Sequence, residues 1–217
     1  MASYQGHLTV SSILGAAYGS VGAVGLDLDW GPVFLGAGLT ALGGLLPDLD
    51  SDSGVPVREL FSLLAAVVPF VVVRRLRRAG IVFETEELIV IAGLVYVLVR
   101  FGIARVFKSY TVHRGMFHSI PAMGIAGLAV FLMSQNPQPV IRYYLAVGAM
   151  LGFLSHLLLD ELYSVDFMGN VVRLNKYAGS AFKFYSPSWS ATATTYVLLI
   201  FLAYLASREL FPAAPAG

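Results

Sequence analysis

Seven apolar runs, separated by short polar segments, constrain the fold of this chain more than any other feature. They are residues 8–26, 31–46, 60–73, 88–106, 117–133, 140–159 and 191–206. A helix that crosses the hydrocarbon core of a bilayer needs about 20 mostly apolar residues. The second and third runs are shorter and could be half-spans or a tilted pair. We therefore predict an all-α fold, a polytopic transmembrane helical bundle with about six to seven spans.

The composition supports a membrane location. Of the 217 residues, 57% are hydrophobic and 12% are charged, and the mean hydropathy is +0.75. An ordinary soluble domain is about a quarter charged, so this chain has too few polar side chains to cover a water-soluble globule. Its one dense basic cluster, residues 74–78, indicates a juxtamembrane anchor rather than a nucleic-acid site. The expected partner is the lipid of the cell (inner or plasma) membrane, which the chain crosses several times.

We predict a single integral membrane domain over residues 1–217. Residues 164–189 are polar, carry several aromatic side chains and are too long for a plain connector. We expect this segment to form a polar loop over a site, and residues 211–217 to form a flexible tail. The N-terminus lacks a basic region and a clear cleavage site, so no cleavable signal peptide is expected. The sequence leaves the oligomeric state open.

All four histidines lie at the ends of apolar runs, and carboxylates accompany them there. The combined set is His7, Asp48, Asp50, His113, His118, His156 and Asp160. If the runs alternate across the bilayer, every member of this set lies on the same side. We therefore expect these side chains to meet at one membrane face and to bind metal. Lysine and arginine residues divide almost evenly between the two sides, which leaves the orientation in the membrane open.

The spacing within the set suits a divalent ion. His156 and Asp160 are four residues apart and share one face of a helix. His113 and His118 are five apart, and they converge only if His113 lies in a loop and His118 in the first turn of the fifth run. The chain has no cysteine, so a metal must use imidazole and carboxylate ligands, which suit Zn²⁺, Mn²⁺ or Fe²⁺.

Each residue by itself has an ordinary structural explanation. A lone histidine at a helix end is usually structural, and an acidic pair after a proline is usually a turn. Together they indicate function, because ionisable residues at membrane depth are costly and every histidine of the chain belongs to the set. Seven candidate ligands exceed the four that one tetrahedral ion needs, which favours a pair of ions. Such a pair activates a water and stabilises charge on a phosphoryl group, and Arg114 could clamp a phosphate oxygen.

Four short motifs carry a family resemblance. They are an early histidine (His7), G-x-x-P-D-x-D at residues 44–50, H-R-G-x-x-H-S at residues 113–119, and G-x-x-x-H-x-x-x-D at residues 152–160. In this order they resemble the YdjM-like family of membrane-bound metal-dependent hydrolases. That family is also described as LexA-binding, inner-membrane-associated hydrolases, and was formerly a domain of unknown function. The chain departs from the family at Phe117, where threonine is common, and in the long segment that follows Asp160.

The resemblance implies an integral membrane hydrolase that depends on a divalent metal, zinc by preference, as one or two ions. The set is also similar in style to the sites of helical zinc phospholipases C and nucleases. By analogy we expect a phosphoester of a lipid or lipid-linked substrate, cleaved through a metal-activated water. The predicted catalytic residues are Asp50 as general base, Arg114 as the phosphate clamp, and His118. The alternatives are a metal-ion or proton transporter that uses the same cluster, and a non-catalytic membrane regulator with a structural metal site.

Overall fold

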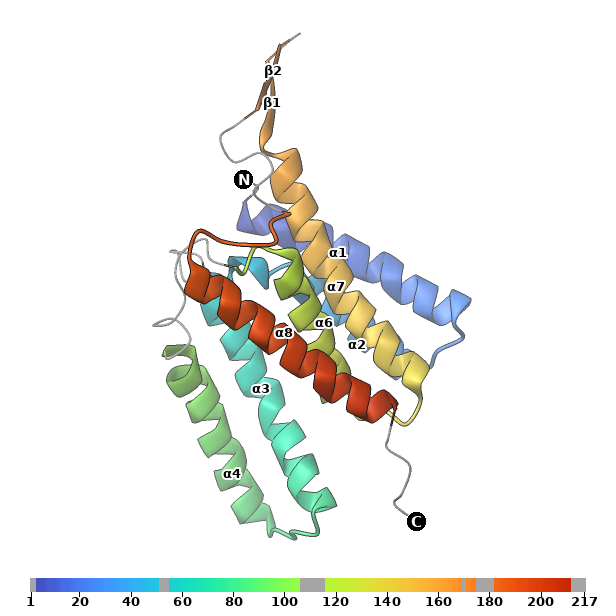
Figure 1. Ribbon diagram of the computed structural model, residues 1–217. Coiled ribbons are helices and arrows are strands. Elements are labelled where there is room, and N and C mark those ends of the chain that lie inside the picture. Colours follow the sequence, from blue (N-terminus) through green and yellow to red (C-terminus); the bar gives the residue numbers. More distant parts are fainter. Residues whose placement is uncertain (1–2, 51–54, 106–115, 169–170, 175–181, 212–217) are drawn as a thin grey trace. The chain divides into compact units, whose positions relative to one another are not determined.

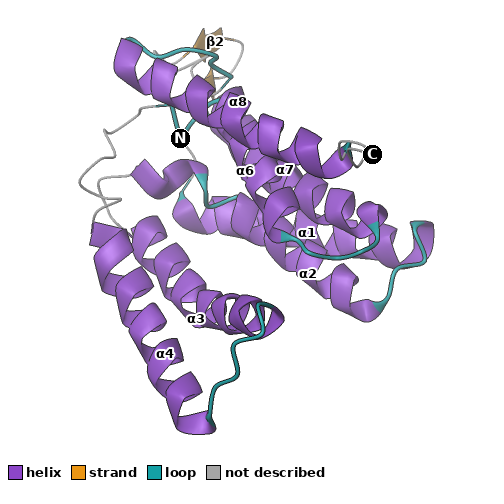
Figure 2. Ribbon diagram, turned by 60° about the horizontal axis from the view of Figure 1, so that its bottom comes forward, coloured by secondary structure: helices purple, strands orange, loops and turns teal. Residues whose placement is uncertain are grey.

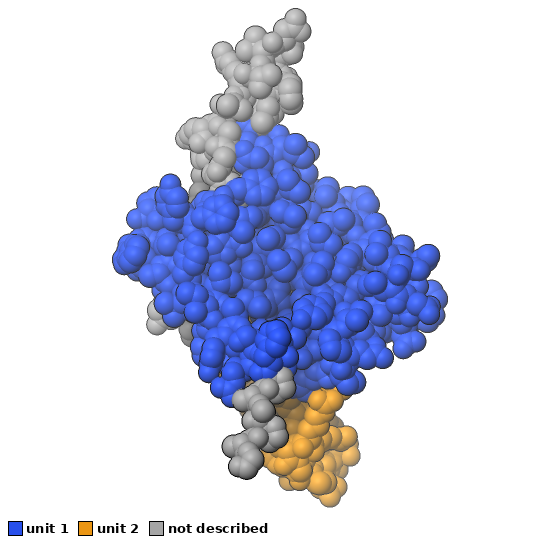
Figure 3. Space-filling view, turned by 45° about the vertical axis from the view of Figure 1, so that its right-hand side comes forward, with its two compact units in different colours: residues 1–48, 114–217 blue, residues 49–113 orange. Residues whose placement is uncertain are grey.

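The computed structural model describes residues 3–50, 55–105, 116–168, 171–174 and 182–211. The chain divides into two compact units, coloured separately in Figure 3. Unit 1 combines Met1–Asp48 with Arg114–Gly217, and unit 2 is Leu49–His113. Each of the seven apolar runs lies largely within a helix, so the predicted all-α fold is confirmed.

Unit 1 is a helical bundle with α7 at its centre (Figures 1 and 2). Helix α7 (Pro139–Leu162) packs against α1, α2 and α6, and α8 packs against α6. Side chains such as Phe153 and Leu157 on α7 are almost fully buried and form the core of the bundle. The other helices are α1 (Tyr4–Ser20, continued by the π-helical turn Val21–Gly25), α2 (Trp30–Gly43), α6 (Ile120–Met133) and α8 (Trp189–Leu210).

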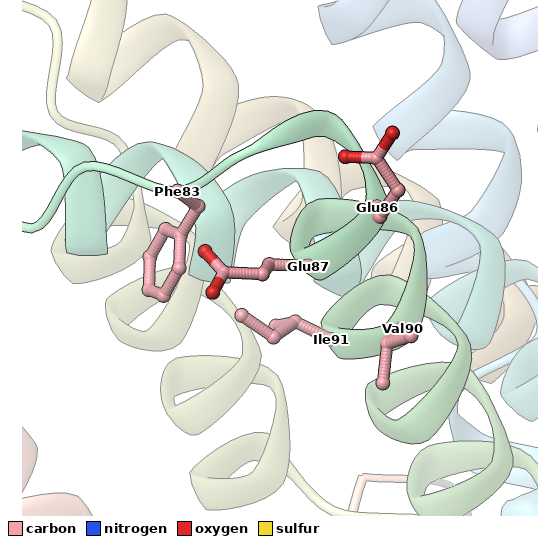
Figure 4. Close-up of a pocket in the computed structure, with 5 residues that line it drawn as sticks. All are labelled: Phe83, Glu86, Glu87, Val90 and Ile91. Atoms are coloured by element: carbon pink, nitrogen blue, oxygen red, sulfur yellow. The ribbon is translucent and has the colours of Figure 1, made fainter.

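Unit 2 is a helical hairpin. Helix α3 (Val55–Arg78) packs against α4 (Thr85–Val97) and against the π-helical segment Leu98–Ile103 that continues α4. A reciprocal capping box between Glu84 and Glu87 starts α4. An open surface pocket near this cap contains no residue of the predicted metal set (Figure 4). Its lining residues are Phe83, Glu86, Glu87, Val90 and Ile91.

Three helical segments are long and apolar enough to cross a membrane: Tyr4–Gly25, Pro139–Leu162 and Trp189–Leu210. Helices α2 and α6 have 14 residues each, which corresponds to about 21 Å, less than the roughly 30 Å of a hydrocarbon core. Large apolar side chains on α8, including Val197, Ile200 and Phe201, are exposed. In a bilayer these side chains face lipid, because nothing else in unit 1 covers them among the described residues.

The segment predicted to be a polar loop contains a short β-hairpin. Strand β1 (Val165–Met168) pairs antiparallel with β2 (Val171–Leu174), with Val165 opposite Leu174 and Met168 opposite Val171. Valine and phenylalanine favour extended backbone. The composition of the whole segment does not reveal this preference, because polar residues flank the two strands. The predicted flexible tail lies outside the described residues beyond Phe211.

Close backbone contacts hold α1, α2 and α7 together. The glycines of the first apolar run predict such an approach, and Gly15 lies directly against the carbonyl of Ala37 on α2. A Cβ atom at Gly15 would come within 2.5 Å of that oxygen. On α7, a Cβ at Gly152 would meet the backbone of Thr40 and Gly44. The absence of side chains at these positions therefore determines how closely the three helices pack.

We expect Gly15→Ala to destabilise the protein by about 1–3 kcal/mol, because the added methyl group forces α1 and α2 apart. The measurement is the thermal unfolding midpoint of detergent-solubilised protein. Gly38→Ala is the matched control, since nothing lies within 4 Å of a Cβ there and alanine favours a helix. Equal midpoints for the two variants would contradict the close contact between α1 and α2.

Candidate metal centre

His7 lies in the first turn of α1. The hydroxyl of Ser3 caps this helix by accepting a hydrogen bond from the Gly6 N–H at 3.1 Å, so the helix begins at Tyr4. The His7 side chain is buried. The capped start thus holds an imidazole inside unit 1 at the end of a candidate membrane span.

Asp48 follows α2. That helix ends at Gly43, and Pro47 begins a 3₁₀ turn over Pro47–Asp50. Proline suits the first position of such a turn because its φ is already fixed near the helical value. The Asp48 side chain is half-buried. The turn therefore ends α2 and places a carboxylate directly beside the end of the helix.

His118 lies just before α6. The Ser119 hydroxyl caps that helix by accepting from the Ala122 N–H at 3.2 Å, and it donates to the Met116 carbonyl at 2.5 Å. Helix α6 therefore begins at Ile120, so His118 directly precedes the N-cap residue at the start of the fifth apolar run. The side chain is nevertheless buried within unit 1.

Four donor atoms from three chain segments converge. His118 Nε2 lies 3.6 Å from Asp48 Oδ1 and 3.8 Å from Asp160 Oδ2. His156 Nε2 lies 3.6 Å from each of the same two oxygens. His156 and Asp160 are one turn apart on α7, as their spacing predicts, and both are buried. Each of the two imidazole nitrogens therefore faces the same two carboxylates. Two triads that share His156 could each hold a metal ion: His7–Asp48–His156 and His118–His156–Asp160.

His7 extends this quartet. Its Nε2 lies 3.3 Å from Asp160 Oδ1, the oxygen that the quartet does not use. Its ring stacks on the ring of His156 with centroids 3.6 Å apart and an interplanar angle of 13°. Asp160 thus presents one oxygen to the quartet and the other to His7, which lets it bridge two neighbouring positions.

The spacing fits a shared cation better than hydrogen bonds. Charge-assisted N–H···O bonds are about 2.7–2.9 Å long, and the quartet separations are 3.6–3.8 Å. Ligand atoms on a tetrahedral zinc at about 2.0–2.2 Å lie about 3.3–3.6 Å from one another. His156 Nε2 is buried and has no hydrogen-bond partner among the described residues, although two carboxylates face it. These residues could hold a metal ion.

The other nitrogen of His156 explains its orientation. Nδ1 lies 2.7 Å from the carbonyl oxygen of Gly44, which can only accept, so Nδ1 carries the proton. The lone pair is therefore on Nε2, directed at the carboxylates. A backbone carbonyl that fixes the tautomer of a ligating histidine is a common feature of metal sites. The sequence does not predict the hydrogen bond between His156 and the Gly44 carbonyl, although Gly44 is the first residue of the G-x-x-P-D-x-D motif.

The charge state of Asp48 also suits a ligand. Burial by itself would raise the pKa of its carboxyl group, but contact with His118 and the charges of His156 and His7 outweigh this effect. The pKa of Asp48 is therefore lowered from its usual value of 3.8. The carboxylate stays ionised at neutral pH, as metal coordination requires.

The structure brings together five of the seven predicted ligands: His7, Asp48, His118, His156 and Asp160. Asp50 ends the 3₁₀ turn, but its side chain lies outside the described part of the chain. His113 and Arg114 also lie outside the described residues. For these three residues the roles stay predictions.

A family model described as YdjM inner membrane protein matches residues 1–209. The chain belongs to the YdjM family. Membership confirms the resemblance of the four motifs and, together with the three candidate spans, places the protein in the inner membrane. No curated protein and no solved structure matches the chain. The YdjM match spans all five clustered residues.

We expect Asp160→Asn to weaken metal binding by at least about tenfold, because it removes the charge shared by the quartet and His7. Metal content after dialysis, measured by inductively coupled plasma mass spectrometry, tests this. Asp29→Asn is the control, an exposed carboxylate whose side chain makes no capping bond to α2. Equal metal content in both variants, or a folded wild-type protein without metal, would contradict the site.

Gly44→Ala should also lower metal affinity, by about tenfold, although residue 44 supplies no ligand. Its Cβ would collide with Ser11 on α1 and displace the carbonyl that orients His156. Adding Ser11→Gly removes that collision and should restore part of the affinity. Isothermal titration with Zn²⁺ measures both effects, and failure of the second change to restore binding would argue against this positioning role.

Proposed function

We propose that this YdjM protein is an integral membrane metal-dependent hydrolase. The observation that carries the proposal is the quartet of Asp48, His118, His156 and Asp160, in which each histidine nitrogen lies 3.6–3.8 Å from two carboxylate oxygens. Imidazole with carboxylate is the ligand chemistry of hydrolytic zinc sites. A bound divalent ion, Zn²⁺ by preference, would lower the pKa of a water and stabilise charge on a phosphoryl group.

Its substrate is a phosphoester of a lipid or a lipid-linked molecule. His7 lies in the first turn of the candidate span Tyr4–Gly25, and Asp160 lies in the last turn of the span Pro139–Leu162. The cluster therefore lies where membrane helices end, at the depth of lipid headgroups. A phosphoester at this depth would meet the site without leaving the membrane.

Each residue then has a distinct task. The quartet residues hold the ion, and the Gly44 carbonyl keeps the lone pair of His156 directed at it. His7 contacts the second oxygen of Asp160, so these two side chains could begin a second metal position. Asp50, two residues after Asp48 in the sequence, is proposed as the general base and Arg114 as the clamp for a phosphate oxygen.

A non-catalytic regulator with a structural metal site is the second candidate. If all four quartet donors bound one ion, they would complete a tetrahedral shell, which is typical of structural zinc. A five- or six-coordinate ion in the same quartet would keep positions open for water. The transporter alternative has less support, because the hydroxyls of Ser11, Thr40, Tyr18 and Tyr144 inside unit 1 already donate to backbone carbonyls.

Asp50→Asn separates catalysis from metal binding. If Asp50 is the general base, turnover should fall by about 100-fold or more while the metal stays bound. The assay uses a soluble probe, bis(p-nitrophenyl) phosphate, and a panel of phospholipids, with metal content measured on the same preparations. Asp29→Asn serves as the control and should retain activity. A fully metal-loaded wild-type protein that cleaves no phosphoester in the panel would favour the structural-metal alternative.

A further inference from the structure

Residues 182–189, which lead into α8 and include its first residue, carry three exposed aromatic side chains. This segment is termed the aromatic strap. Phe184, Tyr185 and Trp189 are 56%, 76% and 81% exposed. Phe182 at the other end of the strap packs instead against the core around Phe153 and Leu157. The strap therefore has one partly buried anchor and three large aromatic groups that unit 1 does not cover among its described residues.

The strap is attached to the residue that follows a predicted metal ligand. Lys183 forms a parallel β-bridge with Ser119, the neighbour of His118, and the Ile120 N–H donates to the Lys183 carbonyl at 3.2 Å. The segment before α8 accordingly passes over the start of α6 in Figure 1. Phe184 and Tyr185 follow this bridge by one and two residues, so their backbone lies within about 8 Å of it.

Hydrogen bonds to α8 hold the other part of the strap. The Ser186 N–H donates to Thr192 Oγ1 at 3.0 Å, and the Tyr196 hydroxyl donates to the Phe184 carbonyl at 3.0 Å. The hydroxyl of Ser188 caps α8 by accepting from Ala191 N–H. The strap is thus fixed at both ends, and its backbone at Lys183 is held beside Ser119, the neighbour of His118.

The strap also lies at a defined depth. Trp189 is the first residue of α8, which is itself a candidate membrane span. Tryptophan and tyrosine favour the boundary between lipid and water, where an apolar ring and a polar group are both satisfied. Because the strap joins α8 to the start of α6, this end of α8 is on the same side of the bundle as His118.

We propose that the aromatic strap is the docking surface for a phospholipid whose headgroup phosphate lies at the metal centre. The inference rests on the proposed function and adds the position of the lipid: its glycerol and upper acyl carbons contact Phe184, Tyr185 and Trp189. A lipid is the occupant that these observations favour, because the exposed rings continue directly into a membrane-spanning helix at headgroup depth. A soluble phosphoester would make no use of rings placed there.

Fluorescence of Trp189 tests the proposal without requiring turnover. The chain has two tryptophans, so Trp30→Phe leaves Trp189 as the only one. Metal-loaded protein in detergent is titrated with dihexanoyl phosphatidic acid, and inorganic phosphate is titrated in parallel. We expect a saturable blue shift of the emission with the lipid and none with phosphate. Phe184→Ala or Tyr185→Ala should weaken the lipid affinity by about tenfold.

Phe34→Ala is the matched control. Phe34 is 69% exposed but lies near the start of α2, whereas the cluster residue Asp48 follows the end of that helix. Its replacement should leave the lipid affinity unchanged. Asp160→Asn should weaken lipid binding along with metal binding, because the strap and the metal centre hold the same molecule.

Several results would overturn the proposal. They are an equal response to inorganic phosphate, a lipid affinity insensitive to Phe184→Ala and Tyr185→Ala, and a lipid affinity unchanged by Asp160→Asn. In the last case the rings would be membrane anchors only. An emission shift that follows protein concentration instead of lipid would indicate a second copy of the chain as the occupant. Lipid binding with the expected dependencies but without hydrolysis would support the strap and contradict the hydrolase.

Discussion

The metal centre depends on the close approach of α1, α2 and α7. Gly15 lies against the backbone of Ala37, and Gly152 lies against the backbone of Thr40 and Gly44. Only this close packing lets a side chain on α7 reach the carbonyl at the end of α2, where His156 donates to Gly44. Larger residues at these positions would separate the helices, and the ligands they carry would separate with them.

The cluster is costly for the protein unless something compensates for it. Carboxylates that are partly or largely removed from water lose solvation, and at Asp48 the neighbouring imidazoles offset this loss. The separations of 3.6 Å between His156 Nε2 and the oxygens of Asp48 and Asp160 are too long for strong hydrogen bonds. A divalent cation among these atoms would supply the missing charge and coordinate all of them. The same divalent cation would therefore both neutralise the clustered carboxylates and supply the proposed chemistry.

Helix ends, rather than helix middles, carry the functional groups of this protein. His7 follows the N-cap of α1, Asp48 follows α2, and His118 precedes the N-cap of α6. These positions keep the ionisable groups away from the hydrocarbon core, where they are least stable. The aromatic strap lies beside the same ends and is joined to the residue next to His118. The proposed metal chemistry and the proposed lipid contact would therefore meet at one level of the membrane.

The sequence by itself determined the helices and identified the five residues that the structure brings together. Apolar runs must become helices in a bilayer, because no other single segment satisfies its own backbone hydrogen bonds there. The four-residue spacing of His156 and Asp160 places both on one face of α7, and alternation of the runs places the remaining candidates on one side. The sequence did not predict the short β-hairpin at residues 165–174, because polar residues surround its strands and favour a loop.

Only the tertiary structure decided which atoms face each other. No spacing in the sequence connects His7 with the second oxygen of Asp160, or His118 with the same two oxygens that face His156. These distances depend on how closely the helices approach and on where α2 ends and α6 begins. Both result from packing between segments far apart in the sequence, such as His156 and Gly44, which are 112 residues apart. An apolar run is a property of consecutive residues and can be read from the sequence. The distances between ligand atoms are set only when the helices pack together.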